Sequence, residues 1–379
     1  MPKFQIRFQP RILYASELQV SAYVFDNAPL YLKESGAASR FLTAEPSTMT
    51  SSAANLLTIV ILSRGKCDLS KGISIYLITM ALADLLVVVF CIILASLFSR
   101  LIPASFLFYT AVCSTNAVLS YATIDCSVWL TIAFTFDRFV AICCHNLKVT
   151  YCTTKTATLV IGIVCALNVL RNVPFYFKFR PYGFFNGIPW GCATRLEFFS
   201  FPGWVTFFWI HHLLNPLIPY VLIVVLNALT VRHIVVANRA RRELKYSANG
   251  SQRMDPEMAQ RRKSIVLLFV VSGSFILLWF TKVAVFLLME ISNRHAYPSY
   301  NHPVILADQT GTMLFYLGTC TNTVVYALTQ RKFREELKRM PSKKDLFKSL
   351  ARINVYNIYH HALVNLLRHL LKYNQIGYT

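Results

Sequence analysis

Long apolar segments, separated by short polar connections, dominate the chain. Six of them are long enough to cross a membrane as helices: residues 73–98, 109–136, 158–177, 204–231, 264–291 and 304–328. A helix of roughly 20 apolar residues spans a hydrocarbon core about 30 Å thick. Lipid offers the backbone no hydrogen bonds, and the alternating pattern of barrel strands is absent, so we expect helices. The pattern predicts an all-α membrane protein.

A seventh apolar segment lies near the start, at residues 53–63. It is too short to span a membrane alone, and the stretch 34–52 before it is charged and rich in Ser and Thr. We therefore expect a seven-transmembrane helix bundle with a truncated first helix. After the last span, the basic stretch 331–340 holds Phe333 and Leu337 four residues apart, which favours a short amphipathic eighth helix on the membrane surface.

Composition and charge agree with a membrane setting. Hydrophobic residues make up 55% of the 379 residues and charged residues only 15%, whereas about a quarter of a soluble domain is charged. The net charge of +21 is concentrated in segments such as 232–263, which carries nine Lys and Arg residues. Basic loops mark the cytoplasmic side of membrane proteins. The lipid bilayer is an expected partner of these spans, and no nucleic acid is expected.

Three polar residues inside the spans suggest an ion site. Asp84 lies in the second span, Ser127 in the third and Asn322 in the seventh. Charged residues at membrane depth are costly, so they are candidates for function. A carboxylate, a hydroxyl and an amide oxygen suit a hard cation such as sodium. The alternative is a polar helix-packing network with water. No other metal and no cofactor is expected.

Two further acidic residues lie in the third span. Asp137 precedes Arg138 at the predicted cytoplasmic end, where the pair could be a switch or an interfacial ion pair that closes the helix. Asp125 lies deeper, and Trp129 or Asn168 are its candidate partners.

Two cysteines fall on the predicted outer side. Cys113 begins the third span, and Cys192 lies in the long connection 171–203. Both face an oxidising compartment, which favours a disulfide that would pin the connection over the bundle. Two free thiols are the alternative.

The outer halves of the fifth and sixth spans hold candidate ligand contacts. His212, Trp279 and Lys282 combine a basic group with aromatic rings, which suits a ligand that carries a carboxylate beside a ring. The alternative is that Lys282 extends to the membrane interface and Trp279 is a packed core residue. No enzyme motif stands in a suitable context, so we do not expect an enzyme.

In their order and spacing, these motifs resemble those of the rhodopsin-like (class A) G-protein-coupled receptors. The matching positions are Asn55, Met80-Ala81-Leu82-Ala83-Asp84, Cys113, Ser127, Asp137-Arg138-Phe139, Phe275, Trp279, Asn322-Thr323-Val324-Val325-Tyr326 and Phe333. The resemblance implies an activation switch formed by Asp137, Arg138, Phe275, Trp279 and Tyr326. It also implies the sodium site and the disulfide at the residues named above. The chain departs from the family at Thr281 and Thr323, which replace prolines, and at Asn227, which replaces a tyrosine.

A narrower resemblance rests on residues 136–152 and 320–337. These stretches are similar to the orphan receptors called probable G-protein coupled receptor 139, and most similar to the fish-type paralogues of that group. The group implies a small extracellular ligand, with aromatic amino acids or short peptides as candidates. It adds Tyr121 and Thr312 to the ligand-binding residues, and it carries Arg where this chain has Lys282.

The resemblance implies that the chain is divided into four segments. Residues 1–52 are an extracellular N-terminus (a mispredicted or alternative exon is the other reading), and residues 53–328 are the seven-transmembrane receptor domain. Residues 329–340 are the amphipathic helix, and residues 341–379 are a cytoplasmic tail. A multi-pass receptor at the plasma membrane that activates heterotrimeric G proteins is expected. A membrane transporter or channel and a signalling-dead decoy receptor are the alternatives.

Overall fold

The computed structural model describes residues 51–94, 106–185, 187–195, 197–247, 256–292 and 303–339. The predicted N-terminal segment 1–52, apart from Ser51 and Ser52, and the predicted tail 341–379 lie outside these residues.

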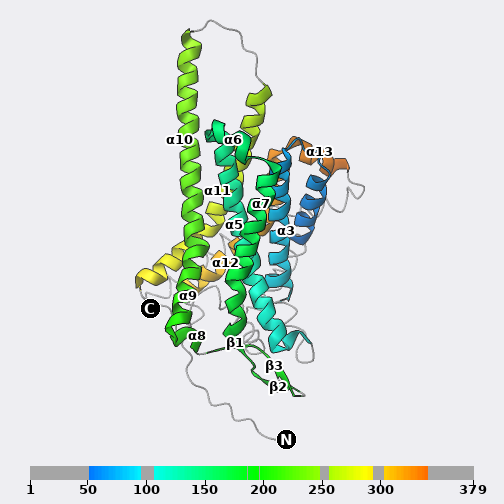
Figure 1. Ribbon diagram of the computed structural model, residues 1–379, viewed down its shortest axis with the longest axis vertical. Helices are drawn as coiled ribbons and strands as arrows, with labels where there is room; N and C mark the ends of the chain where they lie inside the picture. The colour runs from blue at the N-terminus through cyan, green and yellow to red at the C-terminus, as the bar shows by residue number, and fades with distance from the viewer. Residues whose placement is uncertain are drawn as a thin grey trace, which may run out of the picture.

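In the described part of the chain, seven helical segments run along one axis as a bundle (Figure 1). In chain order they are the helix Ser51–Ser63, α3 (Lys71–Val87) with η1 (Val88–Ile93), α5 (Thr110–Cys143), α7 (Thr154–Asn172) with η3 (Val173–Lys178), α9 (Pro202–His212) with η4 (Leu213–Leu217) and α10 (Ile218–Ser247), α11 (Pro256–Ser292) and α12 (Pro303–Thr329). The shorter elements are η2 (Phe106–Phe108), α6 (His145–Tyr151), α8 (Glu197–Ser200) and α13 (Arg331–Arg339).

The outer faces of these helices are apolar, as lipid requires. Among the described residues, five helical segments are long and apolar enough to cross a membrane, and the helix Ser51–Ser63 is a shorter apolar one. The sixth predicted span, 304–328, is helical in α12 but is not among these five. Large side chains such as Leu159, Leu170 and Leu277 are exposed on the bundle surface, where lipid replaces water as the solvent. The predicted all-α membrane fold is confirmed.

The core lies toward one end of the bundle. Tyr76, Phe134, Tyr326 and Phe333 are fully buried in a single hydrophobic cluster. Phe333 belongs to α13, so this short helix is attached through its apolar face, as its spacing predicts. We refer to this end of the molecule as the α13 end, and to the opposite end as the disulfide end.

The helix Ser51–Ser63 occupies the half of the bundle nearer α13 (Figure 1). Two polar side chains fix it to α12. The Asn55 amide donates to the carbonyl oxygen of Thr319 at 2.9 Å, and the Thr58 hydroxyl donates to Thr323 Oγ1 at 2.8 Å. These bonds between buried groups define how the first helix packs against the seventh.

The connection predicted over residues 232–263 is largely helical, which corrects the expectation of a loop. α10 continues to Ser247 and α11 begins at Pro256, so only residues 248–255 lie outside the described structure. The segment is rich in Arg, Lys and Ala, which are strong helix formers. The basic residues indicated where the chain leaves the membrane, but α10 and α11 continue as helices beyond that level.

The long connection at the disulfide end folds into two small hairpins. Strands β1 (Phe179–Arg180) and β4 (Ala193–Thr194) pair antiparallel, and β2 (Gly183–Phe185) pairs with β3 (Ile188–Trp190). Gly187 and Gly191 have φ near +75°, a conformation that glycine adopts without steric cost. The sequence predicted a loop here and missed both hairpins.

Candidate ligand and switch sites in the helical bundle

A buried polar core joins α3, α5 and α12. The Ser127 hydroxyl donates to Asp84 Oδ1 at 2.5 Å, and the Asn322 amide donates to Asp84 Oδ2 at 2.8 Å. Asp84 is almost completely buried. Within the described residues, no cationic side chain forms an ion pair with it. The structure therefore brings together the three residues that the sequence singled out.

A cavity of about 40 Å³ borders this polar core. Its walls include Asp84, Ser127 and Asn322 on one side and Phe275 and Trp279 on the other. A water molecule needs roughly 10–15 Å³ of such space. The cavity is therefore large enough for a few waters or a hydrated small cation.

The predicted switch residues of α11 stack together at this cavity. The rings of Phe275 and Trp279 are 5.4 Å apart at an interplanar angle of 26°, and Trp279 meets Phe315 of α12 edge-on at 4.9 Å. A shift of α11 against α12 would therefore change both the ring contacts and the space next to Asp84.

Aromatic residues surround the predicted ligand contacts near the disulfide end. His212 is buried, its Nδ1 lies 2.9 Å from the carbonyl oxygen of Phe208, and its ring stacks on Phe286. Tyr121 stacks on Phe175 with ring centres 4.2 Å apart. Tyr121 and His212 thus face a common aromatic environment formed by α5, η3, α9 and α11.

Lys178 adds a second basic group to this region. Its Nζ lies 5.9 Å from the centre of the Tyr121 ring and within 5.3 Å of the rings of Phe179 and Phe198. The side chain is fully buried. The sequence reasoning missed it because it falls in the connection after the fourth span.

Lys282 is buried and pairs with an acidic residue of α12. Its Nζ lies 2.9 Å from Asp308 Oδ1, and the side chain is only 3% exposed. The alternative that it extends to the membrane interface is therefore wrong. Gly311 permits this approach, because a Cβ there would lie 3.0 Å from Lys282 Cγ and 3.1 Å from its backbone nitrogen.

Thr312, the remaining predicted ligand contact, lies one turn beyond Asp308 on α12. Its hydroxyl donates to the backbone carbonyl oxygen of Asp308 at 3.0 Å. The side chain is half-buried, on the helix that also carries the partner of Lys282. Its position is compatible with a ligand contact, which stays a prediction.

Asp125 has partners different from those that were predicted. It forms an ion pair with Arg171 of α7, and it accepts hydrogen bonds from the amides of Asn172, at 2.6 Å, and Asn215. Nδ1 of His211 lies 4.0 Å from it. Asp125 therefore links α5 to α7 and to η4.

Neither predicted partner of Asp125 bonds to it. The indole Nε1 of Trp129 has no hydrogen-bond partner in the described part of the chain, and the Asn168 amide donates to the carbonyl oxygen of Val164. The prediction failed because it considered only neutral partners near the same depth. Arg171 lies at the end of the fourth span and reaches back into the bundle.

Asp137 and Arg138 form an ion pair with each other at the α13 end of α5. Both side chains are buried, and Arg138 Nε donates to Asp137 Oδ2 at 3.0 Å. Tyr326 is also buried near this end, with its ring 6.1 Å from that of Phe333. The predicted switch residues thus extend from the disulfide half of the bundle to the α13 end.

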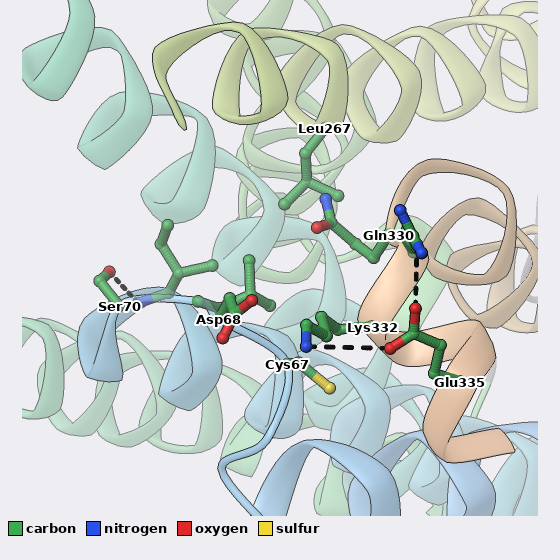
Figure 2. Close-up of a pocket in the computed structure, with 10 residues that line it drawn as sticks. Cys67, Asp68, Ser70, Leu267, Gln330, Lys332 and Glu335 are labelled. Atoms are coloured by element: carbon green, nitrogen blue, oxygen red, sulfur yellow. Dashed lines mark hydrogen bonds and ion pairs between the residues drawn. The ribbon is translucent and has the colours of Figure 1, made fainter. Parts of the chain in front are cut away.

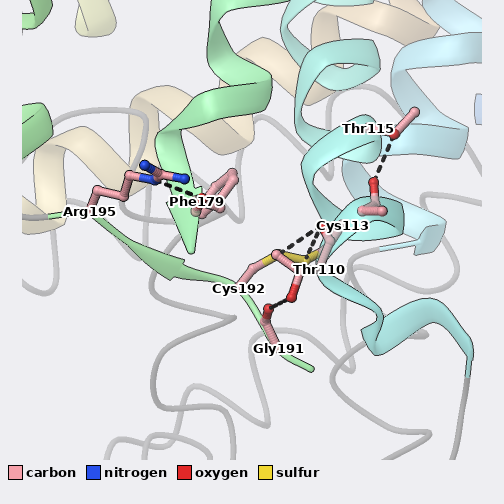
Figure 3. The surroundings of a disulfide bond; sticks show 8 residues. Thr110, Cys113, Thr115, Phe179, Gly191, Cys192 and Arg195 are labelled. Atoms are coloured by element: carbon pink, nitrogen blue, oxygen red, sulfur yellow. Dashed lines mark hydrogen bonds between the residues drawn. A yellow bond between two sulfur atoms is a disulfide. The ribbon is translucent and has the colours of Figure 1, made fainter. Parts of the chain in front are cut away.

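The predicted disulfide joins Cys113 of α5 to Cys192, and the alternative of two free thiols is wrong (Figure 3). The Thr110 hydroxyl donates to the carbonyl oxygen of Gly191 at 2.7 Å, next to the disulfide. Together these contacts hold the hairpins against the end of α5.

Besides Lys178, the sequence reasoning missed Asp308, Arg171 and Asn215 as functional candidates. Asp308 carried a usable signal, because every ionisable residue within a span is a candidate by default. Its pairing with Lys282 needs the rotational position of two helices, which the residue pattern of each helix does not give.

The fold and these sites define a membrane-embedded seven-helix bundle of receptor type. Residues 54–326, more than half of the chain, match the family described as 7 transmembrane receptor (rhodopsin family). The chain belongs to this family and is a multi-pass membrane protein and a G-protein-coupled receptor. It is also similar to galanin receptor 2a of Danio rerio, with 23% identity over 295 residues, which cover 76% of this chain and 73% of the relative.

Proposed function

We propose that this receptor binds a small extracellular ligand at the disulfide end and activates heterotrimeric G proteins from the plasma membrane. The orientation follows from the basic residues of α10 and α13, which are typical of the cytoplasmic side. The disulfide agrees with an oxidising outer side at the opposite end.

The buried pair of Lys282 and Asp308 is the observation that supports the ligand class. A ligand with both a carboxylate and an ammonium group would satisfy each partner when the pair separates. Trp279 and Phe286 lie three and four residues from Lys282, on the same face of α11, and offer apolar rings beside the charges. An aromatic amino acid or a short aromatic peptide combines these features, as the narrower resemblance implies.

The proposed mechanism is a shift between two packings of the bundle. A ligand changes such an equilibrium only by its different affinity for the two states. Contact with Lys282 and Trp279 would favour the state in which α11 moves away at the α13 end. Arg138 would then leave Asp137 and face the G protein. The resemblance to the probable G-protein coupled receptor 139 group suggests signalling through phospholipase C and calcium.

The polar core fits the sodium ion that the resemblance implies. Asp84 is a buried carboxylate without a cationic side chain among the described residues, and buried charges are normally paired or bind metal ions. Asp84, Ser127 and Asn322 would supply the oxygen ligands. A bound cation would neutralise Asp84 and favour the packing in which the three side chains stay together.

Galanin is a second candidate ligand, because the chain is similar to a galanin receptor. Because the identity to that receptor is 23%, galanin is a weaker candidate than a ligand that fits the charges and rings of the pocket. It belongs in the same panel of test compounds.

Calcium and cAMP assays in transfected cells test the proposal. The panel contains tryptophan, phenylalanine, short aromatic peptides and galanin. We expect Lys282→Met to weaken the potency of the active amino acid about 10- to 100-fold, because one charge-assisted bond is lost. Lys282→Arg should keep most of the potency. Lys155→Met, at an exposed position on α7, is the matched control, and surface abundance is measured for each variant.

Two results would contradict this function. Solute flux without G-protein dependence would favour the transporter or channel. A correctly inserted receptor that binds tryptophan but evokes no signal through any G protein would favour the decoy receptor.

A further inference from the structure

Two cysteines of neighbouring helices lie against each other inside the bundle, apart from the sites described above. Cys126 of α5 is buried, and its Sγ donates to the carbonyl oxygen of Cys165 of α7 at 3.9 Å. The two thiols are also in hydrogen-bond contact with each other. Neither belongs to the disulfide that joins α5 to the hairpins, and both are free thiols. The two residues therefore form a dithiol between α5 and α7.

The place of Cys165 on α7 agrees with this contact. Cys165 lies two helical turns before Asn172, which bonds to Asp125 of α5. Residues at this spacing lie on one face of a helix. Cys165 is therefore on the face of α7 that packs against α5, and Cys126 directly follows Asp125 in the chain. The dithiol lies along the same contact between helices as the Asp125 cluster.

The bilayer gives access to one of the two thiols. Cys165 is half-buried, and Ile163 and Leu167 beside it on α7 are exposed on the outer surface of the bundle. Cys126 lies in the hydrophobic core, against which Cys165 packs. A small reagent dissolved in the lipid can therefore reach Cys165 first, with the Cys126 thiol directly behind it.

We propose that Cys126 and Cys165 are a redox modification site, which forms a disulfide within the chain when an organic hydroperoxide of the lipid phase oxidises it. Cysteines whose side chains point apart cannot be bridged without movement of the backbone, whereas these two thiols already meet. The inference does not depend on the ligand or on the orientation proposed above.

The reaction consumes one hydroperoxide for each disulfide. The Cys165 sulfur attacks the outer peroxide oxygen, the O–O bond breaks, and the thiol proton passes to the leaving alkoxide, which gives a sulfenic acid and an alcohol. The Cys126 sulfur then attacks the sulfenic sulfur, the S–S bond forms, and hydroxide leaves as water with the Cys126 proton. The two sulfurs together lose the two electrons that the peroxide takes up.

The disulfide would hold α5 against α7. It would connect residues 39 positions apart in the chain. A cross-link of this kind stabilises the folded state mainly by restricting the unfolded chain. We expect oxidation to raise the unfolding temperature of the receptor by about 5 °C. The same treatment should not raise the unfolding temperature of Cys126→Ser.

Peptide mapping of the full-length receptor in lipid nanodiscs tests the site. The receptor is treated with cumene hydroperoxide, the remaining thiols are blocked with N-ethylmaleimide in denaturant, and trypsin is added without a reductant. Trypsin cleaves after Arg138 and Lys155, so Cys126 and Cys165 fall in separate peptides. We expect mass spectrometry to find these peptides joined by a disulfide after oxidation. In the untreated receptor, Cys165 should carry the maleimide instead.

Serine variants assign the two sulfurs. Cys126→Ser and Cys165→Ser should each abolish the cross-link at nearly unchanged side-chain size. Cys67→Ser is the matched control and should retain it. Cys67 is also buried, and it is the only cysteine among the residues drawn in Figure 2. Thermal unfolding of each untreated variant checks that the receptor is folded. Where a serine variant fails to fold, fragmentation of the joined wild-type peptides identifies both cysteines directly.

The proposal is overturned if Cys165 still reacts fully with the maleimide at hydroperoxide levels that oxidise methionines of the same receptor. It is also overturned if the Cys165 peptide stays joined to the same partner peptide in Cys126→Ser, because another cysteine then supplies the second sulfur. A disulfide that forms without a rise in the unfolding temperature would contradict the predicted stabilisation of the contact between α5 and α7.

Discussion

At the residue scale, hydrogen bonds replace ion pairing at Asp84. A hydroxyl and an amide each occupy one carboxylate oxygen, and neither neutralises the negative charge. Buried charge without a partner is costly in a protein interior. A bound cation is the simplest source of the missing compensation, and its effect can be measured without any ligand.

Sodium should stabilise the wild-type receptor through this carboxylate. We expect the melting temperature of the purified protein to rise when sodium chloride replaces N-methylglucamine chloride at equal ionic strength, because binding to the folded state alone shifts the equilibrium. Asp84→Asn should lose this difference, and Asp137→Asn, which changes another buried carboxylate at the α13 end, should retain it. A sodium effect that persists in Asp84→Asn would contradict the site.

Two residues that depart from the family also have defined contacts. Thr323, in place of proline, pairs with Thr58 of the first helix. Asn227, in place of tyrosine, accepts a hydrogen bond from the Ser272 hydroxyl at 2.9 Å. α11 and α12 both run as unbroken α-helices through the positions of their lost prolines. At Thr323, a side-chain bond to the first helix therefore stands where a proline would kink α12.

At the element scale, the Asp125 cluster positions the helices that form the ligand site. One carboxylate connects α5, α7 and η4 through Arg171, Asn172 and Asn215. Tyr121 lies one turn from Asp125 on the same helix, so the cluster also sets the depth of the proposed pocket. An ion pair of this kind is costly to break when only one partner is removed.

Arg171→Met should therefore destabilise the receptor by about 3–5 kcal/mol, because it leaves Asp125 buried and unpaired. The double variant Asp125→Leu/Arg171→Met should recover most of that loss. Thermal unfolding in detergent measures both effects. A single variant as stable as the wild type would show that the pair contributes little to the folded bundle.

The disulfide is the second element-scale constraint. It closes a segment of 79 residues between α5 and the hairpins. Loss of a native disulfide commonly costs about 2–5 kcal/mol. We expect Cys113→Ser to lower the unfolding temperature and to weaken ligand potency, whereas Cys91→Ser, at a cysteine of η1 that is not part of this disulfide, should do neither. Unchanged potency in Cys113→Ser would mean that the hairpins do not shape the ligand site.

Sequence patterns predicted the helices better than the contacts between them. The spans, the amphipathic helix at Phe333 and the Cys113–Cys192 disulfide followed from length, periodicity and compartment. The partner of Lys282 and the true partners of Asp125 did not, because hydropathy gives the lipid-facing stripe but not the register between neighbouring helices. The hairpins escaped because strands of two or three residues leave no alternating pattern.

At the scale of the whole molecule, the proposed orientation places the α13 end inside the cell. Cysteine substituted at Phe184, on the exposed hairpin β2–β3, should react with a membrane-impermeant maleimide on intact cells. Cysteine at Arg331, on exposed α13, should react only after permeabilisation. A background without reactive free cysteines serves as the control. The reverse pattern would contradict the proposed orientation.

For signalling, ligand binding at the disulfide end must change the structure of the bundle at the α13 end. Lys282 lies near the ligand side, the cavity beside Trp279 and Asp84 lies between the ends, and Arg138 lies where the G protein is expected. These sites share α5, α11 and α12, so a single rearrangement of three helices can affect all of them.

Nucleotide exchange on purified heterotrimeric G proteins tests the central claim most directly. The receptor in nanodiscs is mixed with each G-protein class and with tryptophan, phenylalanine or a short aromatic peptide. Accelerated exchange that is lost in Arg138→Ala, while folding and binding of the added amino acid or peptide stay unchanged, is the predicted result. Exchange that is not accelerated for any G protein, or acceleration that is equal in Arg138→Ala, would contradict the account.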